Sequence, residues 1–196
     1  MKDLFNTPNT LTLIRIIVSP FFLLIIKFPS NLKVVVAIFV VFIAASITDF
    51  FDGYLARKYN KITKLGQILD PLADKLMIAF ALFSFAYIGA IEKWIVVLIL
   101  FRDFSITFHR FYLLSKGKII AATNTGKWKV VVQIIMIIII LLSISLSIYV
   151  NGERNIILPI LKVVEQFIIW FCLGISVVSG IEYFVKVQVK NAHKTS

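Results

Sequence analysis

The chain has 196 residues, is 60% hydrophobic, and carries 21 Lys and Arg against 10 Asp and Glu, for a net charge of +11. A mean hydropathy of +0.95 excludes an ordinary soluble domain, whose surface could not hide so much apolar side chain. The composition therefore predicts an all-α integral membrane protein. Most basic residues lie between the apolar runs, where they set topology, so we expect a lipid bilayer and not a nucleic acid as the partner.

Six apolar runs are long enough, at about 20 residues each, to cross a bilayer as helices. In chain order they are Leu11–Phe28, Leu32–Tyr54, Ile68–Ile91, Trp94–Leu114, Val130–Val150 and Val163–Val185. The first run is expected to be retained, because it contains Arg15 and lacks a small-residue cleavage site. Residues 1–9 are expected to form an interfacial segment and residues 186–196 a cytoplasmic tail. Residues 1–196 would then form a single membrane domain.

Lysine and arginine are distributed unevenly over the segments between these runs. Twelve lie at the N-terminus, in the second and fourth connections and at the C-terminus, whereas five lie in the other connections. Because positive charge is enriched on the cytoplasmic side, both termini are predicted to be cytoplasmic in a multi-pass protein of the cell (inner) membrane.

Four aspartates gather within 26 residues, at the predicted cytoplasmic ends of the second and third runs. Asp49 and Asp52 are three residues apart, and Asp70 and Asp74 are four apart, so each pair is expected on one face of a helix. Pro71 fits a helix if it lies in the first turn, which would put Asp70 and Asp74 near a helix start. A charge at the centre of a span costs about 2.5–3.5 kcal/mol, so this clustering predicts a polar, water-accessible cavity on the cytoplasmic side.

Carboxylates gathered in this way repel one another unless cations lie between them. Hard oxygen ligands suit Mg²⁺ or Mn²⁺, and a two-metal carboxylate site is typical of phosphoryl transfer. Small residues continue the same helix faces, with Gly53 and Ala56 in one run and Gly66 before the next. A single aspartate pair would more often be paired with Lys or Arg. Two pairs with matched small residues favour the metal site.

The spacing Asp49-x2-Asp52-Gly53-x2-Ala56-Arg57-x8-Gly66-x3-Asp70-x3-Asp74 resembles the complete signature of the CDP-alcohol phosphatidyltransferase family. The resemblance implies six transmembrane helices, a homodimer and two divalent cations, Mg²⁺ or Mn²⁺. It also implies transfer of a phosphatidyl group from a CDP-lipid to an alcohol, with release of CMP. The segments NTPNTLTLIRIIVSPFF, DPLADKL and SGIEYF are similar to the phosphatidylglycerophosphate synthases of that family, which use CDP-diacylglycerol and glycerol 3-phosphate.

The resemblance also implies roles for individual residues. The metal ligands would be Asp49, Asp52, Asp70 and Asp74, and Asp74 would in addition be the catalytic general base. The CDP-lipid would be bound by Gly53, Ala56, Arg57 and Gly66. One stretch departs from those synthases. In the fourth run they commonly carry a segment that begins with Arg-Glu and ends with Gly-Leu-Arg. Here the segment reads RDFSITFHR, and Asp103 and His109 are the departures.

Four basic residues near the predicted cytoplasmic mouth are candidates for binding the phosphate of the acceptor: Arg102, Arg110, Lys127 and Lys129. Arginine offers a fork that matches phosphate, and four cations beside a metal site fit an anionic acceptor such as glycerol 3-phosphate. The alternative is that they are ordinary positive-inside charges. His109 has no matching histidine nearby and is expected to be packed or interfacial rather than to act as a ligand.

Two other functions compete with this one. The first is the same reaction with inositol phosphate or serine as the acceptor, and the signature does not distinguish these acceptors from glycerol 3-phosphate. A divalent-cation transporter would place its acids near the bilayer midplane, on interrupted helices of an inverted repeat. The acids here lie to one side and no repeat is visible, so an enzyme is favoured.

Several residues in the last three runs are expected to have structural roles. We expect Trp94, Trp128 and Tyr183 to be anchors at the membrane interface. Cys172, the one cysteine, is expected to be buried. The Ser176–Gly180 pair is expected to pack against another helix or a second copy.

Overall fold

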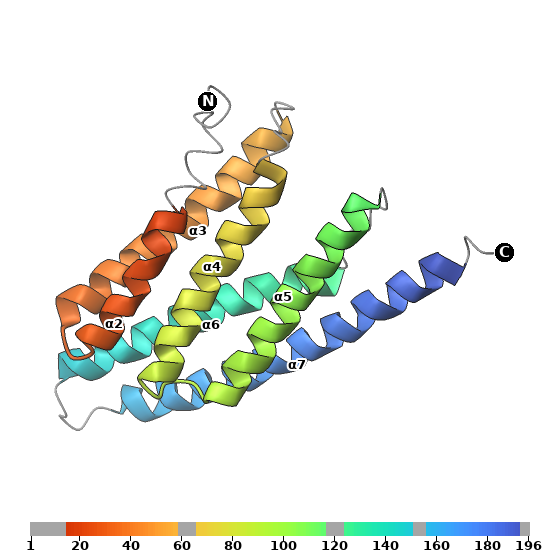
Figure 1. The fold of residues 1–196 in the computed structure, drawn as a ribbon. Helices are drawn as coiled ribbons and strands as arrows, with labels where there is room; N and C mark the ends of the chain where they lie inside the picture. Colours follow the sequence, from red (N-terminus) through yellow and green to blue (C-terminus); the bar gives the residue numbers. More distant parts are fainter. Residues whose placement is uncertain (1–14, 59–65, 117–123, 151–155, 193–196) are drawn as a thin grey trace.

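A computed structural model of the chain describes residues 15–58, 66–116, 124–150 and 156–192. For residues 49–58, 66–72, 74 and 189–192 it describes the helix but not the side chains. The described residues form helices joined by short turns, without a strand, which confirms the all-α prediction. After a helical turn at residues 15–18, the elements are η2 (Ser19–Phe22), α2 (Leu23–Lys27), α3 (Leu32–Lys58), α4 (Gly66–Tyr87), α5 (Lys93–Ser115), α6 (Asn124–Val150) and α7 (Ile157–Ala192) (Figure 1).

Two helices in the described part of the chain are long and apolar enough to cross a membrane. They are Asn124–Val150, with a mean hydropathy of 2.9, and Ile157–Gln188, with a mean hydropathy of 1.9. Shorter apolar stretches cover Leu32–Thr48 and Lys75–Tyr87. These features are those of a membrane protein, and the number of helices that cross the bilayer stays a prediction.

The helices extend beyond the apolar runs that predicted them. α6 begins six residues before Val130, and α7 continues through residue 192, into the segment expected to be a tail. α4 begins at Gly66, so Pro71 is its sixth residue and lies beyond the first turn in which it was expected. Hydropathy marks only the apolar part of a helix, whereas backbone hydrogen bonding continues into polar sequence. Residues 1–9 lie outside the described part of the chain.

The first helical segment changes its geometry at Pro20. Residues 15–18 are α-helical, η2 is a 3₁₀ turn with Pro20 at its start, and α2 then resumes the α-helix. Proline lacks the amide hydrogen that would continue the preceding helix. The Ser84 hydroxyl on α4 donates hydrogen bonds to the carbonyls of Phe80, at 2.8 Å, and of Phe22, at 3.0 Å. The first segment is thereby tied to α4.

The helices pack in an order that differs from their order along the chain. α6 packs extensively against α7 and also against α3, whereas α5 packs against α4 and α7. η2 and α2 pack more extensively against α4 than against α3. Figure 1 shows α7 as a long helix that diverges from α3 and α4 toward the C-terminus.

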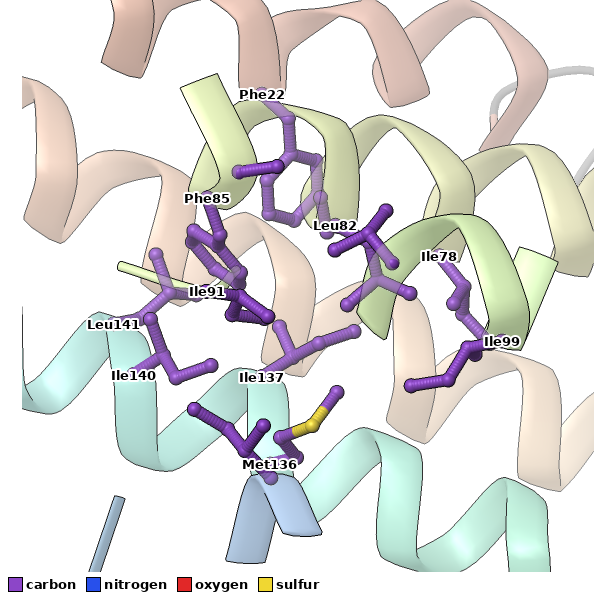
Figure 2. Packing of buried hydrophobic residues seen from close by; sticks show 14 of the residues in the cluster. Phe22, Ile78, Leu82, Phe85, Ile91, Ile99, Met136, Ile137, Ile140 and Leu141 are labelled. Atoms are coloured by element: carbon purple, nitrogen blue, oxygen red, sulfur yellow. The ribbon is translucent and has the colours of Figure 1, made fainter. Parts of the chain in front are cut away.

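One apolar core joins the ends of the helices near the 28–31 and 88–92 turns. Phe22, Leu82, Phe85, Ile137 and Ile140 are buried in it, and Figure 2 shows their side chains converging from η2, α4 and α6. The Phe22 ring meets the rings of Phe42 and Phe85 edge-on, at 5.8 and 6.5 Å between centroids. This core holds that end of the bundle together.

Candidate active site

The four aspartates lie in two continuous helices. Asp49 and Asp52 are near the C-terminal end of α3, and Asp70 and Asp74 are near the N-terminal end of α4. Figure 1 shows these two helix ends at the same end of the bundle. Within a helix, separations of three and four residues place the two members of each pair one turn apart. The four side chains lie outside the described part of the chain.

The residues predicted to hold the CDP-lipid share these two helix ends. Gly53, Ala56 and Arg57 lie in the last turns of α3, and Gly66 is the first residue of α4. Their side-chain surroundings, like those of the aspartates, are outside the described residues. Among the side chains that the structure does describe, no group of three or more His, Cys, Asp or Glu is able to hold a metal ion.

A buried ionic cluster joins α5 to α6. Asp103 of α5 is 3% exposed and Lys129 of α6 is 1% exposed. The Lys129 ammonium forms a salt bridge with Asp103 Oδ2 and donates a hydrogen bond to Gln133 Oε1 at 2.6 Å. Gln133, which is fully buried, donates from Nε2 to Asp103 Oδ2 at 3.2 Å. We call Arg102, Asp103, Lys129 and Gln133 the Asp103 cluster.

Arg102 completes the cluster and connects it to α7. Its Nη1 lies 3.0 Å from Asp103 Oδ1, and its Nη2 donates to the Ser179 hydroxyl at 2.7 Å. The stem of Arg102 crosses α7 at Gly180, where an added Cβ would lie 3.4 Å from Arg102 Cγ. A Cβ at position 180 would therefore be in van der Waals contact with the arginine stem. Ser176 is also buried, so the Ser176–Gly180 pair packs inside the chain.

The charges of the Asp103 cluster do not cancel. One carboxylate faces two cations, Arg102 and Lys129, and Lys75 of α4 also acts electrostatically on Asp103. Buried charges are costly unless paired, and the single carboxylate is the only acid of the cluster. Among the described side chains of the Asp103 cluster, two cations therefore contact one carboxylate.

The sequence alone did not predict two members of this network, Gln133 and Ser179. Gln133 follows Lys129 by four residues, so its position on the same face of α6 was available as a signal. Ser179 carries no such signal, because its partner Arg102 is 77 residues away in the chain. Asp103 was recognised only as a departure from the synthase pattern.

An aromatic cluster lies beside these residues, between α5 and α7. His109 Nδ1 is 3.1 Å from the Tyr183 hydroxyl, and the His109 ring also contacts Tyr112 and Phe184. The packed histidine confirms the prediction. Tyr183 is 1% exposed, so its prediction as an interface anchor was wrong. Trp94 and Trp128 are exposed, as expected of anchors. α7 continues past the apolar run and packs against α5, which buries Tyr183.

The four candidate acceptor residues have different environments. Lys127 is exposed, whereas Lys129, two residues later, is enclosed in the Asp103 cluster. The Arg110 guanidinium lies over the Tyr183 ring, 5.4 Å from its centroid, and the buried Arg110 Nε has no hydrogen-bond partner among the described residues. The same holds for Arg102 Nε.

Helices α6 and α7 are also joined at this end. The Thr125 hydroxyl of α6 donates a hydrogen bond to Glu182 of α7.

Cys172 of α7 is buried, as expected, and it is a free thiol.

Comparison of the amino-acid sequence with known proteins identifies the family of the chain. Residues 5–178 match the family model described as CDP-alcohol phosphatidyltransferase. The chain is 35% identical to the CDP-diacylglycerol–glycerol-3-phosphate 3-phosphatidyltransferase of Bacillus subtilis, over 93% of this chain and 95% of that protein. It is 32% identical to the protein of the same name in Rickettsia bellii, over 91% and 93%. It is also 38% identical to a Mycobacterium tuberculosis protein named "Probable phosphatidylglycerophosphate synthase", over 66% and 63%. The chain belongs to the CDP-alcohol phosphatidyltransferase family of transferases.

Proposed function

We propose that the chain transfers the phosphatidyl group of CDP-diacylglycerol to glycerol 3-phosphate, which yields phosphatidylglycerophosphate and CMP. The observation that carries this proposal is the similarity to relatives of that name along nearly their whole length. The eight-position signature, from Asp49 to Asp74, supplies residues for this reaction at the ends of α3 and α4.

The protein is proposed to be a multi-pass protein of the inner membrane with six transmembrane helices and cytoplasmic termini. Six helical stretches occupy the six apolar runs, and α6 and α7 satisfy length and hydropathy criteria for spanning. α3 and α4 carry their aspartates at one end. The bias of twelve to five Lys and Arg supports the orientation. This orientation places the aspartate end of the bundle at the cytoplasmic surface.

The aspartate side chains fit a divalent-cation site by their chemistry. Four carboxylates, paired one turn apart on two helices, provide the hard oxygen donors that Mg²⁺ and Mn²⁺ prefer. Asp49, Asp52, Asp70 and Asp74 would hold two such ions. When bound, the ions would neutralise phosphate oxygens of the CDP-lipid and stabilise an in-line displacement.

The remaining signature residues would bind the donor and start the reaction. Gly53, Ala56 and Gly66 leave room for the cytidine nucleotide, and Arg57 pairs with its charge. Asp74 takes the proton from the acceptor hydroxyl, and the oxygen attacks the phosphorus that carries diacylglycerol. The bond from that phosphorus to the CMP oxygen breaks, and CMP leaves.

The Asp103 cluster supports an anionic acceptor. Two cations contact its one carboxylate, and the guanidinium groups of Arg102 and Arg110 suit a phosphate, which accepts hydrogen bonds from such groups. Lys129 is enclosed by Asp103 and Gln133, so we assign it to holding α5 against α6 and orienting Arg102 through the shared carboxylate. Arg102, Arg110 and the exposed Lys127 then remain to meet the acceptor.

A homodimer is also part of the proposal. Large apolar side chains are exposed along the helices, among them Phe101, Phe108, Phe167 and Phe171. Lipid or a second copy would cover these surfaces. The Ser176–Gly180 pair is buried in the chain and does not contribute to the dimer surface.

The product of the reaction tests the proposed acceptor. Purified protein is given CDP-diacylglycerol and Mg²⁺ together with glycerol 3-phosphate, inositol phosphate or serine, each in a separate reaction. We expect CMP release with glycerol 3-phosphate alone, and a lipid whose mass corresponds to phosphatidylglycerophosphate. CMP release with serine or inositol phosphate in place of glycerol 3-phosphate would overturn the choice of acceptor.

A further inference from the structure

A second site lies at the opposite end of α3, between that helix and the first helical segment. A groove of about 350 Å³ separates them, and its walls are apolar, with Val18 and Phe21 on one side and Val34, Ala37 and Val41 on the other. Its volume is at the lower end of the range of ligand sites. The groove is therefore large enough for part of an extended apolar chain.

The floor of the groove is apolar and buried. Phe22 and Ile38, both buried, line it from below. The Phe22 carbonyl accepts a hydrogen bond from Ser84, and its ring meets Phe42 and Phe85 edge-on. The first segment is thus held against α4.

The groove opens into a second hollow at the end of the bundle. This hollow, of about 670 Å³, is lined by Phe28, Pro29, Ser30, Asn31, Leu32 and Lys33. Asn31 and Lys33 line both spaces, so the apolar groove and the open hollow meet at these two residues. A ligand with an apolar tail and a polar head would fit these two adjoining spaces, with the tail in the groove and the head in the hollow.

The charged side chains around the opening favour an anionic head group. Lys27 and Lys33 are exposed on the two sides of the turn, and the sequence from residue 16 to residue 48 contains no acid. A cationic side chain at the boundary between apolar and polar surface attracts anionic lipid. We propose that the groove binds one anionic phospholipid, with an acyl chain against Val18, Ala37 and Val41 and the phosphate at Lys33.

This lipid site is separate from the proposed catalytic site. Lys33 and Asp49 belong to the same continuous helix, α3, sixteen residues apart. At 1.5 Å per residue the two positions are about 24 Å apart along the helix axis. A phospholipid at Lys33 is therefore neither the donor nor the product held at the aspartates.

Native mass spectrometry of the delipidated full-length protein tests the site. The protein is mixed with equal amounts of dioleoyl-phosphatidylglycerol and dioleoyl-phosphatidylcholine. We expect preferential retention of phosphatidylglycerol, and Lys33→Gln should reduce this preference about fivefold, because one lysine near a membrane surface adds about that factor. Ala37→Phe should reduce retention of both lipids, since its ring would fill the groove.

Lys162→Gln is the matched control, because Lys162 is an exposed lysine on α7, away from the groove. It should leave the preference unchanged. Equal retention of the two lipids by the unmodified protein would overturn the proposal. So would equal losses in Lys33→Gln and Lys162→Gln, or full retention of both lipids by Ala37→Phe.

Discussion

Replacing Asp74 with asparagine is expected to abolish CMP release while the protein still folds and inserts. Asparagine keeps the size of the side chain but cannot accept the proton of the acceptor hydroxyl, and it removes one anionic donor from the proposed metal site. Loss of a general base alone costs about 10²–10⁴-fold in rate, and loss of metal binding would add to this. The measurement is the rate of CMP release with CDP-diacylglycerol and glycerol 3-phosphate.

Glu92→Gln provides the matched control for Asp74→Asn. Glu92 is an exposed acid in the 88–92 turn, directly before α5. This turn lies at the end of α4 opposite to the one that carries Asp70 and Asp74. It loses the same charge by the same chemical change, so its rate should stay close to that of the unmodified protein. Turnover by a folded Asp74→Asn protein at more than a tenth of the normal rate would contradict the assignment of the base.

Replacing Asp103 with asparagine is expected to lower the free energy of unfolding by about 3–5 kcal/mol. Asp103 is the carboxylate that both Lys129 and Arg102 contact, so its neutralisation leaves two cations facing each other in a buried site. Lys129→Gln should be milder, because Arg102 remains as the partner of Asp103. A double variant with both changes should be more stable than the sum of the two single effects predicts.

Thermal unfolding in detergent measures these effects. Cys172 is the one cysteine of the chain and is fully buried, so a thiol-reactive dye reports unfolding. Lys127→Gln serves as the comparison for Lys129→Gln, since the two lysines are two residues apart and differ in exposure. Equal effects of these two lysine changes, or additive effects in the double variant, would show that the Asp103 cluster does not behave as a coupled unit.

The sequence predicted which residues are charged and on which helices they lie, but not how they pair. Lys129 and Lys127 have the same charge and nearly the same position in the chain, and both were expected near an open mouth. One is exposed and the other is enclosed by Asp103, whose position in the chain is 26 residues earlier. Helical periodicity fixes neighbours within a helix, whereas the rotation of one helix against another depends on packing.

The positions of helix ends show a similar limit. The apolar runs located the helices, but Tyr183 was expected at a membrane interface because it lies near the end of such a run. α7 continues to residue 192, and Tyr183 packs against His109 and under Arg110. A local window of hydropathy contains no information about contacts with another helix. The expectation for the aspartate pairs rests on their spacing within one helix, and α3 and α4 do contain them, but whether their side chains form a site stays a prediction.

The most direct test of the account is a count of divalent cations. Full-length protein is stripped of metal and titrated with Mn²⁺, and free Mn²⁺ is followed by electron paramagnetic resonance, with and without CDP-diacylglycerol. The account predicts two bound ions per chain in the presence of the lipid, and loss of binding in Asp49→Asn and Asp70→Asn but not in Glu92→Gln. Stoichiometric binding that survives both aspartate substitutions, or turnover that proceeds at the full rate in metal-free chelator, would contradict it.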